Sequence, residues 1–271
     1  MTARRPHRRL PSQAARAAER IRAHPVLAAL LLLVLVALPF LVVPALDLAA
    51  SRLFYAEGTG FPGAARGLQA IRDLGRAVEI AFAAILALPL LVKLAFPESR
   101  LLVRPRTTLF VLLTYAIGPG LIVNALFKEH WGRARPRDIV EFGGTLEFTR
   151  VWQLAANCPT NCSFASGEAA SAFFVVAAAF IVPRGWRRAT LAAALLFAAI
   201  VSYARLAMGG HFLSDILAAW AIVLVVMVVL RELVLVRLPP AFDRRAEDRV
   251  AAAGRALRRG LAALRTHSPR L

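Results

Sequence analysis

The stretch PVLAALLLLVLVALPFLVVPAL, residues 25–46, decides the class of fold. It contains no charged side chain, and about 20 apolar residues are enough for a helix to cross the hydrocarbon core of a bilayer. The run is longer than the apolar region of a signal peptide and lacks a convincing cleavage site, so we interpret it as a retained helix. We therefore expect an integral membrane protein.

The composition and the remaining apolar runs agree with this expectation. Hydrophobic residues make up 59% of the 271-residue chain and the mean hydropathy is +0.61, which is too apolar for a soluble domain of this size. Gly118-Pro119-Gly120 predicts a kink in the third run, and residues 47–77 are expected to form a loop with a short interfacial helix around 64–74. We predict an all-α bundle of six transmembrane helices, at about 25–46, 78–96, 107–127, 166–182, 189–206 and 212–236.

The net charge of +18 comes mainly from arginines that cluster at the chain ends and in short loops between apolar runs. The positive-inside rule explains this distribution better than nucleic-acid binding does. We predict a bacterial inner-membrane protein with both termini and the loops after the second and fourth spans in the cytoplasm. The loops after the first, third and fifth spans would face the periplasm. The expected parts are a basic cytoplasmic arm (1–25), a six-helix membrane domain (26–236) and a basic tail (237–271), whose amphipathic stretch suits the anionic inner leaflet.

The first of three polar motifs is KEHWGRARP, residues 128–136. On a continuous helix Lys128 and Arg135 would be roughly 10 Å apart, too far for both to hold one small anion. Gly132 and Pro136 predict that the helix ends inside the motif, which would let the two cations converge. An arginine fork and a lysine ammonium both suit phosphate oxygens. The alternative is that these cations only snorkel to the membrane interface.

The second motif is SFASGE, residues 163–168, at the predicted start of the fourth span. Ser166 and Gly167 would open a helix whose free N–H groups and dipole favour an anion, and Ser166 adds a hydroxyl donor. Glu168 lies in the first turn, where the dipole also favours a carboxylate. The alternative is a plain helix cap with an acidic first turn.

The third motif is RLAMGGHFLSD, residues 205–215. His211 and Asp215 would share one face of a helix. A carboxylate that accepts a hydrogen bond from one imidazole nitrogen leaves the other nitrogen free as a nucleophile. Arg205 adds a third candidate phosphate ligand, and the Gly209-Gly210 pair allows a tight turn. The alternative is a structural histidine–aspartate pair at a helix start.

Taken together, the motifs resemble the type 2 phosphatidic acid phosphatase superfamily, whose pattern is Lys-x6-Arg-Pro, Pro-Ser-Gly-His and Ser-Arg-x5-His-x3-Asp. The resemblance covers about residues 78–236 and implies that His211 attacks phosphorus to form a phosphohistidine while Asp215 orients it. It further implies that no metal or other cofactor is needed, because cations and backbone amides hold the phosphoryl oxygens. The implied substrate-binding residues are Lys128, Arg135, Ser166, Gly167 and Arg205.

The chain departs from the family pattern in the second and third motifs, and the change at Glu168 concerns the proton for the leaving group. Ala165 and Glu168 replace the family's proline and histidine, and Ala204 replaces the serine before Arg205. Glu168 could act as the acid only in its protonated form, whereas three cations and a helix N-terminus favour its ionised form. His130 is the alternative acid, and loss of activity is a third reading. Cys158 and Cys162, on the expected periplasmic side, could form a disulfide or remain free thiols.

We expect a lipid phosphatase, a phosphoric monoester hydrolase that acts at the periplasmic membrane surface on a lipid monophosphate or diphosphate. The sequence Asn-Cys-Ser-Phe-x-Ser-Gly-Glu at residues 161–168 resembles that of lipid A 4'-phosphatases, so lipid A is one expected substrate. Undecaprenyl pyrophosphate and phosphatidylglycerophosphate are alternatives. Phosphotransfer to a lipid acceptor is another alternative, and an anion transporter or anion-binding protein is the non-enzyme reading. The expected partners are the lipid substrate and the bilayer, and the oligomeric state is not readable.

Overall fold

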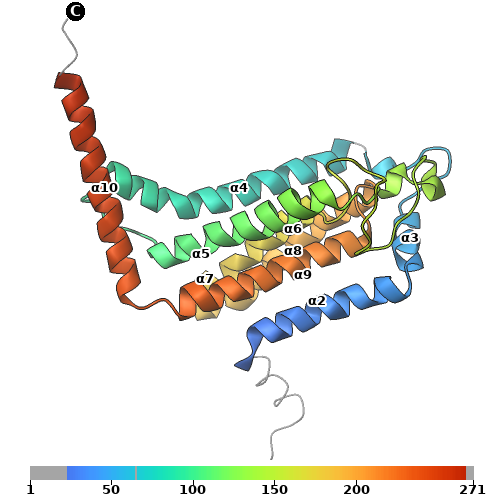
Figure 1. Cartoon of the computed structure of the whole chain (residues 1–271), viewed down its shortest axis with the longest axis horizontal. Coiled ribbons are helices and arrows are strands. Elements are labelled where there is room, and N and C mark those ends of the chain that lie inside the picture. Colours follow the sequence, from blue (N-terminus) through green and yellow to red (C-terminus); the bar gives the residue numbers. More distant parts are fainter. Residues whose placement is uncertain (1–22, 65, 267–271) are drawn as a thin grey trace, which may run out of the picture.

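The computed structural model describes residues 23–64 and 66–266, and this part of the chain is nearly all helical, with no β-sheet (Figure 1). The expected arm, residues 1–25, lies almost entirely outside the described residues. Five helical segments are long and apolar enough to cross a membrane. They are α2 (Pro25–Val42), α4 (Arg66–Ala95), α5 (Pro105–Tyr115) continued by η2 (Ala116–Lys128), α8 (Arg187–Ala207), and α9 (Leu213–Leu230) continued by η7 (Arg231–Val236).

The sixth expected span, at 166–182, is present but shorter than a bilayer core. It consists of α6 (Gly167–Phe174), the 3-10 turn η5 (Val175–Ala177) and α7 (Ala178–Ile181). Fifteen residues at helical rise reach roughly 22 Å, against a hydrocarbon thickness of about 30 Å. The helix can be short because α6 is buried in the bundle, where it packs against α4, α8, α9 and η2. The polar segment between η2 and α6 folds over its N-terminal end (Figure 1).

The region 47–77 differs from the sequence-based expectation. The chain forms α3 (Ala45–Arg52) and the short turn η1 (Pro62–Ala64), and α4 then runs without a break from Arg66 to Ala95. The prediction of a separate interfacial helix is therefore wrong, because α4 continues into the second span. Gly75 does not interrupt it. A β-carbon at that position would lie 2.9 Å from Val201 Cγ2, so the glycine allows α4 to pack closely against α8.

The expected kink at Gly118-Pro119-Gly120 takes the form of a wider helix. The α-helical turns of α5 give way to π-helical turns at Ala116, and these continue to Lys128. Proline cannot donate a backbone hydrogen bond, so an α-helical ladder is interrupted there. The side chain of Asn124 donates to the carbonyl of Pro119 at 2.8 Å and satisfies that acceptor.

All three polar motifs gather at one end of the bundle, beside α3 (Figure 1). The loop over this end contains the short turns η3 (Pro136–Asp138) and η4 (Val140–Phe142). At the opposite end, η6 (Arg184–Trp186) precedes α8, and α10 (Ala241–Thr266) crosses the ends of α4 and α5. Asp243 of α10 pairs with Arg106 at 2.7 Å, and Glu247 pairs with Lys93 at 3.2 Å.

Candidate active site

The two cations of the first motif converge because the chain turns back after η2. Gly132 makes this turn with φ +72°, and a β-carbon there would lie 1.7 Å from the carbonyl oxygen of Ala155. Only glycine fits at such a contact and such a backbone angle. Lys128 and Arg135 then line one cavity of about 470 Å³ together with Arg205. The structure thus brings three predicted phosphate ligands to the same space.

Arg135 is held in place by a residue that sequence reasoning missed. Its Nη2 donates to the backbone carbonyl of Asn161 at 2.6 Å and to the Asn161 side-chain oxygen at 3.0 Å. Burial lowers the pKa of Arg135, although a guanidinium stays protonated at neutral pH. Asn161 lies between the two cysteines, and no local pattern in the sequence marks it as a partner of this arginine.

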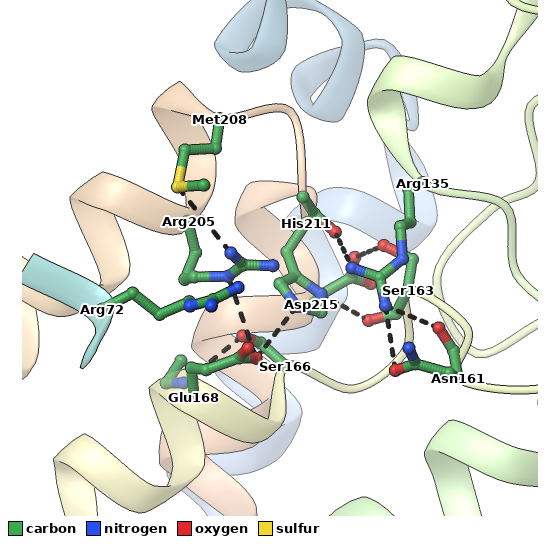
Figure 2. Close-up of polar contacts among 12 residues, drawn as sticks. Arg72, Arg135, Asn161, Ser163, Ser166, Glu168, Arg205, Met208, His211 and Asp215 are labelled. Carbon is green, nitrogen blue, oxygen red and sulfur yellow. Dashed lines mark hydrogen bonds and ion pairs between the residues drawn. The ribbon is translucent and has the colours of Figure 1, made fainter. Parts of the chain in front are cut away.

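His211 is fully buried, and its two ring nitrogens have different surroundings (Figure 2). Nδ1 lies 2.7 Å from the backbone carbonyl oxygen of Ser163. Since a carbonyl can only accept, Nδ1 carries the proton and the lone pair is on Nε2. Nε2 lies 3.6 Å from Oε2 of Glu168. Burial lowers the pKa of His211 to about 4, so the imidazole is neutral at neutral pH.

The expected contact between Asp215 and the imidazole of His211 is absent. Between these two described residues there is no hydrogen bond and no ion pair within 4.0 Å. Asp215 Oδ2 instead accepts from the Ser163 hydroxyl at 2.6 Å and from the backbone N–H of Phe212 at 2.9 Å. Asp215 therefore positions His211 indirectly, by fixing Ser163, whose carbonyl holds the ring. The expected shared helix face is wrong, because α9 starts at Leu213, after His211, and the side chain of Asp215 points to the neighbouring loop.

A buried ion network supports this arrangement. Arg133, which is fully buried, donates to Asp215 Oδ1 at 2.5 Å and to Asp47 Oδ2 at 2.8 Å. Asp47 also accepts from the backbone and the hydroxyl of Ser214, at 2.9 and 2.5 Å. The guanidinium carbon of Arg133 lies 4.3 Å from the ring centroid of Phe212. Sequence reasoning missed Asp47, although a carboxylate directly after a long apolar run was a usable signal.

The second motif starts α6 as expected. Ser166 is the N-cap, its hydroxyl accepts from Ala169 N–H at 3.4 Å, and its own N–H donates to the carbonyl of Asp215 at 3.3 Å. A β-carbon at Gly167 would lie 2.3 Å from the side-chain oxygen of Asn124. Gly167 is thus required for the packing of α6 against η2, a role separate from the anion binding expected at this helix start.

Glu168 occupies the space between the candidate nucleophile and the cations. Its Oε2 lies 3.8 Å from Nε of Arg205 as well as 3.6 Å from the imidazole, and its side chain lines the cavity shared with Lys128 (Figure 2). His130, the alternative acid, is exposed and is absent from the lining of that cavity and of the adjoining one. The geometry therefore favours Glu168 over His130 for proton transfer.

The loop that presents Ser163 is braced from two sides. Phe164 is fully buried, and its ring centroid lies 5.4, 5.1 and 4.8 Å from those of Phe127, Trp131 and Trp152. Cys158 and Cys162 form a disulfide with Cα atoms 5.6 Å apart. The small disulfide loop contains Asn161, so the cross-link and the aromatic cluster together fix the partners of Arg135 and His211.

One helix contributes site residues that the sequence analysis did not place there. Gln69, Arg72 and Arg76 of α4 line the cavity of about 470 Å³ that contains the three predicted phosphate ligands. Glu79 lines the adjoining cavity, which shares Lys128 and Glu168 with it. The sequence analysis assigned Gln69 and Arg72 to the short interfacial helix, Arg76 to the loop after it and Glu79 to the second span, which was expected to start at Val78. No group of three or more His, Cys, Asp or Glu side chains suited to a metal ion occurs among the described residues.

Comparison with known proteins shows which family the chain belongs to. Residues 107–238 match the PAP2 superfamily. The lipid A 4'-phosphatase of Francisella tularensis subsp. novicida is 32% identical over 180 residues, which cover 65% of this chain and 81% of that protein. The chain belongs to the PAP2 superfamily. The matched PAP2 region runs from α5 through η7 and contains all three motifs.

Further relatives and a solved structure extend the PAP2 comparison. A lipid A 4'-phosphatase of Rhizobium leguminosarum is 44% identical over 117 residues, and one of Rhizobium etli is 43% identical over 114 residues. These alignments cover 43% and 42% of this chain, but only 50% and 44% of the two relatives, about half their length.

The crystal structure of a transmembrane PAP2 type phosphatidylglycerolphosphate phosphatase from Bacillus subtilis superposes with a TM-score of 0.51. The two chains are 19% identical, and the match covers 78% of this chain and 96% of the other. At this level of identity the superposition shows a shared fold. Together with the apolar helices, it identifies this PAP2 protein as a multi-pass membrane protein.

Proposed function

We propose that this PAP2 protein is a lipid phosphatase that hydrolyses a phosphate monoester on a membrane lipid, with the 4'-phosphate of lipid A as the first substrate to test. One observation carries the proposal. His211 is a buried, neutral imidazole whose Nδ1 is tied to the Ser163 carbonyl. This leaves the lone pair on Nε2, which lies 3.6 Å from Oε2 of Glu168, and the side chain of Glu168 lines the cavity of the three cations. A neutral imidazole in this tautomer is a nucleophile for phosphorus.

The first chemical step would form a bond between Nε2 of His211 and phosphorus as the bond from phosphorus to the lipid oxygen breaks. Lys128, Arg135 and Arg205 would hold the phosphoryl oxygens and stabilise the charge that develops on them. The fixed positions of Arg135 and His211 mean that little reorganisation is needed in the transition state. The three cations supply this stabilisation themselves, so we propose a reaction that needs no metal.

Glu168 would carry the proton. The carboxylate lies 3.6 Å from Nε2 and 3.8 Å from Nε of Arg205, so a phosphate that enters this space would contact it. A phosphate monoester that arrives as the monoanion can transfer its proton to Glu168, which then gives it to the departing lipid oxygen. In the second step Glu168 would take a proton from water as the water attacks phosphorus. The nitrogen–phosphorus bond then breaks, Glu168 returns its proton to the departing inorganic phosphate, and His211 is again neutral.

The substrate is proposed from the names of the relatives, three of which are lipid A 4'-phosphatases. Undecaprenyl pyrophosphate and phosphatidylglycerophosphate remain chemically accessible substrates, because each presents a terminal phosphate on a lipid head group. Transfer to an acceptor hydroxyl other than water would use the same phosphohistidine. An anion transporter is supported less well, because transport does not require a histidine held in one tautomer.

We propose that the site faces the periplasm of a bacterial inner membrane and that both termini are cytoplasmic. The support is the distribution of charge. The basic loops around Arg100 and Arg187, together with the arginines of α10, lie at the end of the bundle opposite the site. Basic loops are retained on the cytoplasmic side.

The test is phosphate release by the purified full-length protein from lipid A, undecaprenyl pyrophosphate, phosphatidylglycerophosphate and phosphatidic acid. His211→Ala should lower turnover ~10³-fold or more, because the nucleophile is lost. Quenching of the wild type in alkaline denaturant, where the nitrogen–phosphorus bond survives, should trap a phosphorylated peptide that contains His211, and mild acid should release its phosphate. Absence of release from every lipid would refute the proposed activity, and equal release by the variant would remove His211 as the nucleophile.

A further inference from the structure

The outer half of α4 carries a polar stripe, whereas the helix is apolar from Ile80 to Val92. Gln69, Arg72, Arg76 and Glu79 are spaced by three, four and three residues, so they lie on one face. Gln69, Arg72 and Arg76 line the cavity that Arg135 and Arg205 also line, and Glu79 lines the adjoining one. Figure 2 shows Arg72 reaching from α4 toward Arg205 and Glu168.

The positive charges of Arg72 and Arg76 have few carboxylate partners within the protein. Arg72 pairs with its sequence neighbour Asp73 at 3.1 Å, with 32% and 61% of the two side chains exposed. Arg76 makes no hydrogen bond or ion pair with any residue that the structure describes, and Glu79, one turn deeper, is not within ion-pair distance of it. Cationic side chains within a membrane-spanning helix are costly and usually mark a functional site.

The phosphoryl site does not require these arginines for charge balance. Lys128, Arg135 and Arg205 with the carboxylate of Glu168 carry a net charge of two positive units. A phosphate monoester carries roughly −1.5 to −2 at neutral pH, which these groups already offset. The cavity of about 470 Å³ also lies within the range of small-molecule pockets, ~300–1,000 Å³, and holds more than one phosphate group.

We propose that Arg72 and Arg76 form a second anion-binding subsite, which recognises a second phosphate or a carboxylate on the head group whose phosphate is removed at His211. The proposal rests on the proposed function for the assignment of the first subsite. Two guanidinium groups one helical turn apart present planar forks that match phosphate and carboxylate oxygens. The preferred substrate is therefore a lipid head group with at least two acidic groups.

The test measures binding directly, so that it can be read even if no lipid is hydrolysed. Three kinds of non-hydrolysable probe are titrated into the full-length protein in detergent and followed by calorimetry. The probes are methylphosphonate, diphosphonates with one to three carbons between the groups, and phosphonocarboxylates of the same lengths. We expect at least one two-anion probe to bind tenfold or more tightly than methylphosphonate. Which kind gains affinity identifies phosphate or carboxylate as the second group.

Variants separate a defined subsite from the general positive field. Arg76→Gln and Arg72→Gln should reduce the advantage of the two-anion probe about tenfold. Arg137→Gln removes the same charge from another lining residue of this cavity, which lies on η3 rather than α4 and is 46% exposed, and should leave this ratio within twofold. The proposal is overturned if no two-anion probe gains affinity, if the α4 variants keep the full advantage, or if Arg137→Gln reduces it equally. Absence of phosphate release with the affinity pattern intact would instead refute only the proposed function.

Discussion

Nε2 of His211 and Oε2 of Glu168 lie 3.6 Å apart, and neither atom has a hydrogen-bond partner among the described residues. A buried polar atom without a partner costs free energy, so two such atoms facing one space indicate a position that a ligand completes. The family pattern has a histidine where this chain has Glu168. The pair therefore defines both the nucleophile and the proton carrier of the proposed reaction.

Glu168→Gln should lower turnover by about 10²–10⁴-fold, the usual contribution of a general acid–base group. The amide keeps the shape and the helix start but cannot carry a proton. Phosphate release measured at saturating substrate gives the effect. Glu141→Gln, in an exposed part of the outer loop, is the matched control and should stay near wild type. Full activity of Glu168→Gln combined with loss of activity in His130→Ala would show that the acid is misassigned.

The pH dependence of kcat/KM should show a nucleophile that stays neutral in mild acid. Burial lowers the pKa of His211 to about 4, below the ordinary value near 6.5. The imidazole keeps its lone pair as the pH falls from 7 and loses it only as the pH approaches about 4. An acid limb centred near 6.5 would mean that the ring is solvated in the working enzyme.

The alkaline limb of the same profile tests the source of the proton. If the substrate brings the proton that Glu168 passes to the leaving oxygen, only the phosphate monoanion reacts. The second ionisation of a phosphate monoester lies near pH 6, so kcat/KM should decline above about that value. A profile that stays flat from pH 6 to 8 would point to another proton donor.

Asp47→Asn should destabilise the protein by about 3–5 kcal/mol, because it breaks a buried ion pair and leaves Arg133 incompletely compensated. The free energy of unfolding in detergent gives the magnitude. Asp73→Asn is the matched control, because its pair with Arg72 is exposed and such pairs contribute about 0–1 kcal/mol. Equal effects of the two substitutions would exclude a structural role for the network.

The apolar face of α10 should rest on the cytoplasmic membrane surface. Gly254 packs against Leu94, and Leu257 and Leu261 follow on nearly the same face, 53% and 52% exposed, where α10 extends beyond the bundle (Figure 1). In inverted membrane vesicles a cysteine at position 257 should be protected from a membrane-impermeant thiol reagent, whereas a cysteine at position 259 should react. Equal labelling of both would show that the helix stands free of the membrane.

The positions of most spans and the grouping of the motifs were determined by the sequence itself. Apolar length is a local property, so residues 25–46 and 212–236 could be identified as membrane helices without knowledge of their neighbours. Alternation of the spans then places Lys128, Glu168 and His211 at one end, as the structure shows. The turn at Gly132 was also predictable from local sequence, because Gly132 and Pro136 both disfavour continuation of the helix.

Only the tertiary structure decided which side chains meet. His211 is oriented by the backbone carbonyl of Ser163, which carries no signal in the side-chain pattern, and Asp215 acts through that residue. The ion network joins Asp47, Arg133 and Asp215 across 168 residues of chain, and such partners are fixed by packing rather than by spacing. The packing of α4 against α8, which is close at Gly75, likewise joins distant parts of the chain, and the first turns of α4 bring Arg72 and Arg76 to the cavity.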